Sequence, residues 1–387
     1  MRPNPEPLAL YVHWPFCRSK CPYCDFNSHV RDGVDQARWR AALIRELDSS
    51  AGVLGPRRLE TIFFGGGTPS LMPPETAAAL IEHALALFPP SGAVEITLEA
   101  NPTSVEASRL AAFKQAGINR VSLGVQALDD APLRFLGRQH GAREAVQAVE
   151  LARRLFDRVS FDLIYARPGQ SEAAWRAELK QALAMASGHL SLYQLTIEKG
   201  TPFHALMRDG AFALPEEDGA FALFEATQDL TEAAGLPAYE ISNHAAAGEA
   251  CRHNLAYWRY QDYAGIGPGA HGRLVLADGR AVATRGHAKP ETWLAAVERR
   301  GEGGAELACL SPRERAEEML MMSLRLGEGL DVAALARRTG ITLDELAPPS
   351  RRAPLVDEGL LIESAGRLRA TRRGRAVLSA LTAQLLA

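Results

Sequence analysis

The chain has 387 residues, of which 47% are hydrophobic and 23% are charged. Its 33 glycines and 23 prolines keep the composition near globular averages and exclude collagen-like and disordered classes. The 43 basic and 46 acidic residues give a net charge of −3, which excludes a global field that attracts nucleic acid or an anionic membrane. At roughly 100–200 residues per domain, this length predicts one large domain with an appendage.

No segment approaches the roughly 18 apolar residues that a membrane-spanning helix needs. The first residues also lack the apolar run of a signal peptide, so we expect a cytoplasmic protein. The five cysteines are too few and too unevenly placed for a disulfide framework. Three of them fall within eight residues, whereas Cys251 and Cys309 lie far downstream. In a reducing compartment, such a trio indicates a metal site.

Short apolar and β-branched segments alternate with helical patterns from the amino terminus onward. Six strands are predicted, at residues 8–14, 61–64, 95–98, 120–125, 159–165 and 189–196. Helical spacing is found over residues 37–51, 75–87, 104–116 and 142–155. This alternation requires a parallel sheet with right-handed crossovers. Because no nucleotide-binding glycine fingerprint follows the first strand, we predict an α/β fold with a partial, TIM-like (β/α)6 barrel rather than a doubly wound sheet.

The pattern changes after about residue 300. Ser311 and Pro312 are typical of the first positions of a helix, which is predicted over residues 311–326. Shorter helices, an alternating stretch and a final helix follow, at residues 331–339, 342–346, 360–371 and beyond. This mainly helical part resembles a winged-helix-like module. Its arginines make a nucleic-acid reader a third candidate class, which the acidic balance of the whole chain disfavours.

A cysteine cluster directly follows the first predicted strand. Cys17, Cys21 and Cys24 have the spacing C-x3-C-x2-C. Three thiolates in one short loop can hold three irons of a cubane, and one iron is then open to a non-protein ligand. The alternatives are an ordinary loop and a zinc site that recruits His13 or His29 as its fourth ligand. The sequence predicts a 4Fe–4S cluster.

Polar residues and glycines stand at the ends of the following strands. The segment 65–68, Gly-Gly-Gly-Thr, follows the second strand, where glycines let the backbone approach a ligand. Glu99 and Gln126 end the next two strands, and Asp162 lies within the fifth; buried polar groups are costly unless they face a ligand or a partner. Arg138 can bind a carboxylate bidentately. A structural hydrogen bond is the alternative for each residue, but barrels of this kind carry their sites at these strand ends.

The cysteine spacing resembles the signature of the radical S-adenosylmethionine superfamily. The resemblance implies that S-adenosylmethionine chelates the fourth iron and that its reductive cleavage gives a 5′-deoxyadenosyl radical. Further segments, residues 10–17, 21–28, 65–70, 162–170 and 192–195, are similar to the oxygen-independent coproporphyrinogen III oxidase group. The resemblance covers essentially the whole chain and implies that S-adenosylmethionine is contacted by Tyr11, Gly66, Glu99, Gln126, Arg138 and Asp162. In the dehydrogenase of the group, a second molecule of this cofactor also uses positions equivalent to Tyr23, Gly67 and Thr68.

Two features distinguish the subfamilies of this group. The dehydrogenases typically carry a further cysteine two positions after the cluster, where this chain has Phe26. Residues 252–258 look like the H-N-x-x-Y-W element associated with heme in the heme chaperones of the group, the HemW proteins. That likeness implies a heme site formed by His253, Asn254, Tyr257 and Trp258. The histidine would ligate the iron and the two rings would offer flat apolar surface to the porphyrin; a packed loop histidine is the alternative.

The resemblance therefore implies a chaperone that binds heme, a 4Fe–4S cluster and S-adenosylmethionine. Such a protein transfers heme to acceptor hemoproteins, by resemblance respiratory enzymes, which would bring it transiently to the membrane; a homodimer is compatible with this role. The alternative is a coproporphyrinogen III dehydrogenase, which forms protoporphyrinogen IX by oxidative decarboxylation. We divide the chain into the radical S-adenosylmethionine barrel at residues 1–240, a heme-motif and connecting region at 241–304, and a carboxy-terminal module at 305–387. One departure from the group is Ala166-Arg167, where we expect Gly-Leu.

Overall fold

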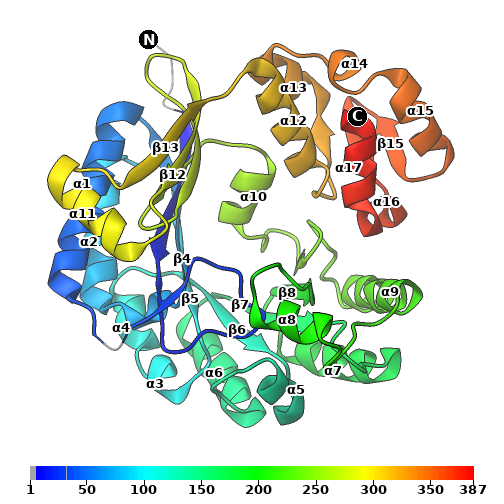
Figure 1. Ribbon diagram of the computed structural model, residues 1–387, viewed down its shortest axis with the longest axis horizontal. Helices are drawn as coiled ribbons and strands as arrows, with labels where there is room; N and C mark the ends of the chain where they lie inside the picture. The colour runs from blue at the N-terminus through cyan, green and yellow to red at the C-terminus, as the bar shows by residue number, and fades with distance from the viewer. Residues whose placement is uncertain (1–5, 32) are drawn as a thin grey trace.

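An 11-stranded sheet forms the centre of the computed structural model, which describes residues 6–31 and 33–387 (Figure 1). Its strand order is β13-β12-β11-β10-β1-β4-β5-β6-β7-β8-β9, so the described sheet is open between β13 and β9. The six predicted strands are neighbours and all run parallel. They are β1 (Pro7–Trp14), β4 (Arg58–Gly66), β5 (Glu95–Ala100), β6 (Arg120–Gln126), β7 (Arg158–Tyr165) and β8 (His189–Gln194). The predicted open (β/α)6 architecture is confirmed. Residues 1–5, part of the segment in which we found no signal peptide, lie outside the described residues.

Helices cover the outer face of the barrel strands. They are α1 (Gln36–Leu54), α2 (Pro74–Leu87), α3 (Ser104–Ala107), α4 (Leu110–Gln115), α5 (Asp130–Phe135), α6 (Ala142–Leu155) and α7 (Glu172–Met185), with η1 (Pro69–Leu71) as a short 3-10 turn. The side chain of Asp35 caps α1, and that of Ser171 caps α7. The helix predicted over 104–116 is broken, because Glu106 turns inward and accepts hydrogen bonds from Ser70 Oγ and from Asn101 N at 2.9 Å.

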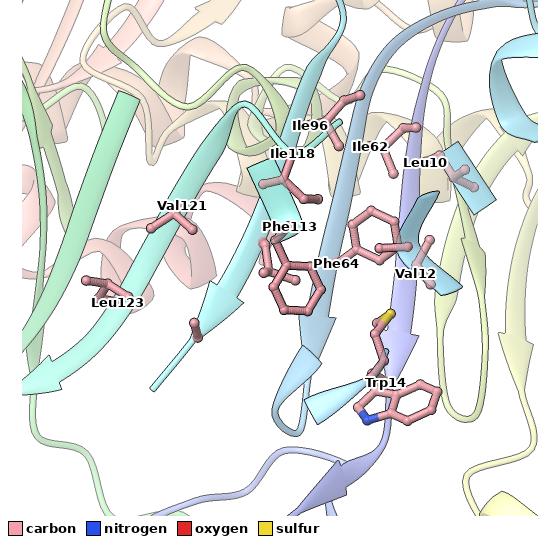
Figure 2. Close-up of a cluster of buried hydrophobic side chains, with 14 of the residues drawn as sticks. Leu10, Val12, Trp14, Ile62, Phe64, Ile96, Phe113, Ile118, Val121 and Leu123 are labelled. Carbon is pink, nitrogen blue, oxygen red and sulfur yellow. The ribbon is translucent and has the colours of Figure 1, made fainter. Parts of the chain in front are cut away.

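Alternate residues of the strands point to opposite faces of the sheet. Leu10, Val12 and Trp14 of β1 and Phe64 of β4 are buried in the core under the helices (Figure 2). The residues between them in sequence point into the barrel, because side chains alternate along a strand. This periodicity places Tyr11, His13, Phe63, Glu99 and Asp162 inside.

Residues 241–304 extend the same sheet at both edges. The strands are β9 (Asn243–Ala245), β10 (Tyr263–Ile266), β11 (His271–Val275), β12 (Ala281–Gly286) and β13 (Gly304–Cys309). Strand β9 pairs with β8, and β10 pairs in parallel with β1. Helices α8 (Pro202–Arg208) and α9 (Glu217–Ala233) precede this region, and α10 (Arg252–Trp258) and α11 (Pro290–Arg300) lie within it. The region that we set apart from the barrel is therefore structurally continuous with its sheet.

The carboxy-terminal module has a hydrophobic core of its own, which includes Leu320, Leu335 and Leu368. Its elements are α12 (Pro312–Ser323), β14 (Leu330–Asp331), α13 (Val332–Thr339), α14 (Leu343–Leu346), α15 (Pro349–Asp357), β15 (Leu361–Ser364), β16 (Arg367–Ala370), α16 (Arg372–Ala376) and α17 (Leu378–Leu386). Helices with a small β-hairpin match the predicted module. Helix α15 was not predicted.

Ion pairs join this module to the rest of the protein. Arg372 contacts Glu225 at 2.8 Å and Asp229 at 2.7 Å, both on α9. Arg325 contacts the buried Glu240 at 3.3 Å. Because Arg372 is among the arginines that suggested a nucleic-acid reader, its use inside the protein weakens that interpretation. Among the described residues, no helix is long and apolar enough to cross a membrane.

Candidate functional site

The three clustered cysteines lie on the loop that follows β1. Two short strands, β2 (Phe16–Cys17) and β3 (His29–Val30), pair in parallel and close the base of this loop. The Asn27 amide donates to the carbonyls of Pro268 and Ala288, at 2.9 Å each, and His13 Nε2 lies 2.9 Å from the Asn27 carbonyl. The loop is thus fixed to the barrel by groups other than its cysteines.

Each thiol has a polar neighbour that stabilises a thiolate. Thr68 Oγ1 donates to Cys17 Sγ at 3.3 Å, and Arg138 Nη1 donates to Cys21 Sγ at 3.3 Å. Cys24 Sγ lies 3.9 Å from Ser28 Oγ. Burial nevertheless raises the pKa of Cys17 and Cys24, and the neighbouring thiols add to this effect. Within residues 6–31 and 33–387, no three Cys, His, Asp or Glu side chains converge on one point as the ligands of a bound metal ion do. The three thiols lie near one another without such convergence.

The glycine loop after β4 packs against the strand that precedes the cysteines. Gly66 has φ of 112°, and a Cβ there would lie 2.6 Å from the His13 ring. A Cβ on Gly67 would lie 2.8 Å from the Phe16 carbonyl oxygen. The missing side chains let the His13 ring approach Gly66 and the Phe16 backbone approach Gly67. The expected approach of a ligand stays a prediction. The packing places the Thr68 hydroxyl against Cys17.

Arg138 connects the carboxyl ends of two strands to the cysteine loop. Its Nη2 donates to Asn101 Oδ1 at 2.6 Å and to the Gly124 carbonyl at 2.8 Å. Its Nη1 also donates to the Tyr23 hydroxyl at 3.5 Å, whereas the buried Nε has no partner. The buried Oε1 of Gln126, at the end of β6, has no donor. Because an amino acid group offers both an acceptor and a donor, these two unsatisfied atoms fit the carboxylate and ammonium of S-adenosylmethionine.

Two carboxyl groups and a phenol line the barrel behind the cysteine loop. Burial raises the pKa of Glu99 to about 8, the neighbouring Asp162 adds to the rise, and a hydrogen bond from Gly66 N opposes it. Burial likewise raises the pKa of Asp162 to about 6, although Ser122 donates to it at 3.2 Å. Tyr11 Oη lies 3.0 Å from His13 Nδ1. Arg138 lies beside the cysteines, whereas Tyr11 and Asp162 lie in the middle of their strands. The Tyr11 ring centre is 6.4 Å from that of His253, so the barrel interior connects the cysteine end with helix α10.

Ala166 and Arg167, which differ from the Gly-Leu expected for the family, lie apart from the residues predicted to bind S-adenosylmethionine. Ala166 has φ of 57°, a left-handed conformation that favours the glycine we expected and costs an alanine about 1 kcal/mol. Arg167 is buried and forms an ion pair with Glu178 of α7. Its side chain is thus engaged with a helix on the outer face.

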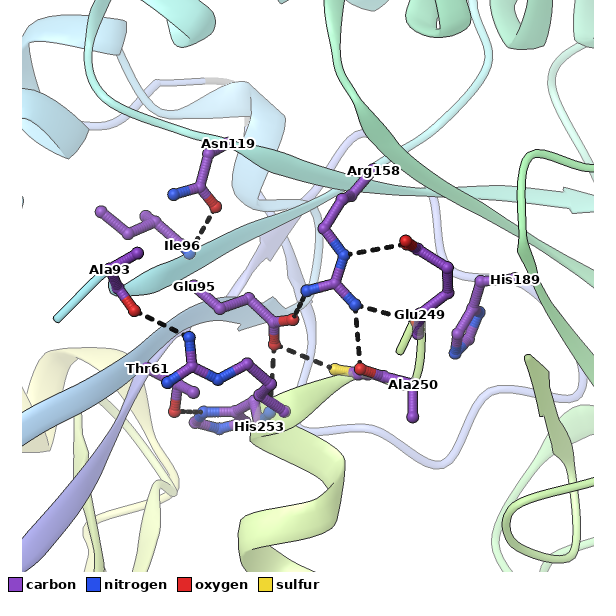
Figure 3. Close-up of polar contacts among 12 residues, drawn as sticks. Thr61, Ala93, Glu95, Ile96, Asn119, Arg158, His189, Glu249, Ala250 and His253 are labelled. Atoms are coloured by element: carbon purple, nitrogen blue, oxygen red, sulfur yellow. Dashed lines mark hydrogen bonds and ion pairs between the residues drawn. The ribbon is translucent and has the colours of Figure 1, made fainter. Parts of the chain in front are cut away.

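The predicted heme motif forms a helix, α10, whose first turn lies beside Glu95 (Figure 3). The backbone N–H of His253 donates to Glu95 Oε1 at 3.1 Å, and the Cys251 thiol donates to the same oxygen at 3.6 Å. Glu95 is the first residue of β5 and also pairs with Arg158, the first residue of β7. The helix is therefore anchored where the strands begin, whereas the cysteine loop lies where they end.

The four motif residues point to different neighbours. His253 is 1% exposed, and Thr61 Oγ1 and Tyr257 Oη each lie 2.7 Å from one of its ring nitrogens. Burial lowers its pKa to about 3, and the nearby Arg120 adds to this effect. Asn254 hydrogen-bonds to Tyr239. Trp258 faces the carboxy-terminal module, where the Arg325 guanidinium lies 4.4 Å from its ring centre.

Sequence reasoning did not identify the groups that hold this helix. Thr61 and Glu95 were assigned to strands without a role. Their signal is the two-residue period of β4 and β5, which points both side chains into the barrel, where a polar group needs a partner.

The comparisons with known proteins give the family and the fold of this chain. The sequence matches the radical SAM superfamily over residues 11–182 and the HemN C-terminal domain family over residues 310–377. It is 41% identical to the radical S-adenosyl methionine domain-containing protein 1, mitochondrial, of Bos taurus, over 99% of this chain and 88% of that protein. It is 37% identical to the heme chaperone HemW of Escherichia coli, over 98% of each chain. The structure of coproporphyrinogen III oxidase HemN from Escherichia coli, a radical SAM enzyme, aligns with a TM-score of 0.82 at 20% identity and covers 99% of this chain and 90% of that one; this likeness shows the fold.

The open barrel and its cysteine loop define a radical SAM protein. Within that superfamily, the chain belongs to the family that includes the HemW heme chaperones. Membership implies a 4Fe–4S cluster and S-adenosylmethionine as cofactors.

Arg138 provides a test of the cofactor site. We expect Arg138→Lys to weaken S-adenosylmethionine binding about tenfold. A lysine ammonium cannot contact Asn101, Gly124 and Cys21 together, and it lacks the planar pair of N–H groups with which a guanidinium binds a carboxylate. Equilibrium dialysis with labelled cofactor measures the change. Arg134→Lys, on α5 and away from these contacts, is the matched control. Unchanged affinity in Arg138→Lys would contradict the assignment.

Proposed function

We propose that this protein is a heme chaperone, which binds heme as cargo and passes it to acceptor hemoproteins. The full-length similarity to HemW proteins carries this proposal: Escherichia coli HemW is 37% identical over 98% of both chains, and Bacillus subtilis HemW is 33% identical over 95% of this chain. The HemN likeness, at 20% identity, supports the fold alone. Respiratory hemoproteins are the proposed acceptors, and delivery to them brings the protein transiently to a membrane surface.

The cysteine loop supports a chaperone rather than a decarboxylase. Phe26 stands where the dehydrogenases typically have a further cysteine, and its side chain is 60% exposed. This position therefore offers neither a thiol nor a group directed into the barrel. We propose that Cys17, Cys21 and Cys24 hold the 4Fe–4S cluster and that the residues around Arg138 hold S-adenosylmethionine, which in this superfamily supplies an organic radical when it is reduced.

The chain's own residues would bind and orient that cofactor. Arg138 and Gln126 present an unsatisfied donor and an unsatisfied acceptor, and Glu99 and Asp162 form the inner wall. Burial and the neighbouring Asp162 raise the pKa of Glu99, which favours its protonated form, and this form can donate a hydrogen bond. Thr68 and Arg138 hold two of the three thiols beside this wall.

A transfer assay tests the proposal. Protein loaded with hemin is mixed with heme-free apomyoglobin as a generic acceptor, and the acceptor's absorbance band is followed. We expect apomyoglobin to take up heme faster from this protein than from serum albumin that carries an equal amount of hemin. A parallel reaction with coproporphyrinogen III, reductant and S-adenosylmethionine is expected to yield no protoporphyrinogen IX. Absence of hemin binding would contradict the proposal, and repeated decarboxylation would establish the dehydrogenase instead.

A further inference from the structure

His253 and Tyr257 form a hydrogen-bonded pair on successive turns of α10. The Tyr257 hydroxyl lies 2.7 Å from His253 Nε2, and Thr61 Oγ1 lies 2.7 Å from Nδ1. Both ring nitrogens are therefore engaged. The imidazole also stacks on Phe63, with ring centres 5.0 Å apart, and it is 1% exposed. To bind iron, this ring would have to give up one of its two hydrogen bonds and turn within a packed site.

Tyr257 is placed differently in the same pair. Its side chain is half-buried, and its ring packs edge-on against Tyr263, with centres 4.4 Å apart. Its hydroxyl has one hydrogen bond among the described residues, the one to His253. A phenol oxygen has two lone pairs, so it can keep the imidazole contact and bind a further group. Tyrosine is an established ligand of heme iron in proteins.

We infer that Tyr257, rather than His253, ligates the iron of ferric heme, and that His253 is a positioning residue that orients the phenolate. This inference rests on the proposed heme-chaperone function. The bond that forms joins Tyr257 Oη to Fe(III), and the bond that breaks is the phenol O–H, whose proton leaves to solvent. No electron is transferred. His253 stays neutral: Thr61 donates to Nδ1, and Nε2–H donates to the phenolate.

Charge balance favours this ligand over a neutral imidazole. The core of a ferric porphyrin carries one positive charge at the iron, which a phenolate neutralises and an imidazole leaves uncompensated beside the barrel interior. Tyr11 of β1, Tyr263 of β10, Cys251 before α10 and Glu99 of β5 are near enough to add to the rise in the phenol pKa, so they disfavour a phenolate that has no iron to neutralise it. Burial keeps the pKa of the free phenol well above its usual range, so the proton leaves as the iron bond forms.

The other motif residues then have supporting roles. Asn254 holds Tyr239, and Trp258 packs under Arg325 of the carboxy-terminal module. Together with the anchor of His253 N–H on Glu95, these contacts fix α10 and thereby the direction of the Tyr257 side chain. The motif therefore orients Tyr257 Oη, and His253 affects heme binding by its hydrogen bond to that oxygen.

The experiment is a hemin titration of the full chain, followed by absorbance and by resonance Raman spectroscopy. We expect the wild type to give a high-spin ferric spectrum with an iron–phenolate vibration. Tyr257→Phe, which removes one oxygen atom, is expected to abolish this vibration and to raise Kd at least tenfold. Tyr263→Phe is the matched control, because this neighbouring ring has no hydrogen bond to His253 among the described residues, and it should keep the wild-type spectrum.

Variants of the histidine separate ligation from positioning. His253→Gln can still donate to the phenolate, so we expect the iron–phenolate vibration to persist, shifted in frequency, with a smaller loss of affinity than in Tyr257→Phe. A wild-type spectrum of histidine-ligated heme would overturn the inference without any variant, as would a Tyr257→Phe protein with unchanged spectrum and affinity. A folded wild type that binds no hemin would instead overturn the proposed function itself.

Discussion

Changing Cys21 to alanine is expected to leave anaerobically reconstituted protein with less than about a tenth of the wild-type iron, because two thiolates cannot hold a cubane that needs three protein ligands. In the structure, Cys21 is the thiol that Arg138 contacts at 3.3 Å, and Arg138 also contacts Asn101 and Gly124. The variant therefore removes an iron ligand and an acceptor of the arginine at once. Iron and sulfide analysis, with the absorbance of the cluster, measures the loss.

The two cysteines outside the loop serve as controls for this experiment. Cys309 is exposed at the end of β13, and Cys309→Ala should reconstitute as the wild type does. Cys251 is buried and donates to Glu95, so Cys251→Ser keeps a donor there and should also retain the cluster. If Cys21→Ala holds a full complement of iron, or if Cys309→Ala loses it, the three clustered cysteines are not the ligand set.

The sequence predicts the barrel well because its signals are local. The six strands and the outer helices α1, α2 and α6 follow from apolar periodicity. The structure uses this periodicity directly, because Leu10 and Val12 face the helices and Tyr11 faces the interior. The helix predicted over 104–116 fails for a reason that periodicity does not contain. Glu106 is buried and accepts from Asn101 N and Ser70, two groups that the fold brings to it from the neighbouring strand end and from η1.

The site is predictable in part for a similar reason. Cysteine spacing and polar residues at strand ends are visible along the chain, and two of the predicted residues, Thr68 and Arg138, lie against the cysteine loop. The environment of each group is not visible. His253 was expected to ligate heme iron, with a packed loop histidine as the alternative. It lies on a helix with both ring nitrogens engaged, one of them by Thr61, which comes from a strand 192 residues away in sequence. The flat face of Trp258 is likewise covered by an arginine of the carboxy-terminal module, at 4.4 Å.

Glu46 shows the same limit at a structural site and gives the second large prediction. This residue of α1 is 7% exposed and accepts from Gly267 N at 2.7 Å, from Gly303 N at 2.8 Å and from Trp293 Nε1 at 3.0 Å. Glu46→Ala leaves three buried donors without an acceptor, so we expect the free energy of unfolding to fall by about 3–5 kcal/mol. Urea denaturation followed by tryptophan fluorescence measures this. Glu82→Ala on α2, for which no hydrogen bond or ion pair is found in the described structure, should change stability little.

The pH dependence of stability distinguishes a buried carboxyl from a simple packing role. Burial raises the pKa of Glu46 from its usual 4.5 to about 7. Between these two values the folded state binds more protons than the unfolded state, so the carboxyl's contribution to stability falls as pH rises from about 4.5 to about 7 and is level above that. A difference of this size corresponds to about 3 kcal/mol. Glu46→Gln has no titrating group here, so its stability relative to the wild type should improve by about that amount between pH 5 and pH 8. A difference between the two proteins that does not change with pH would show that this carboxyl is ionised throughout, held so by its three donors.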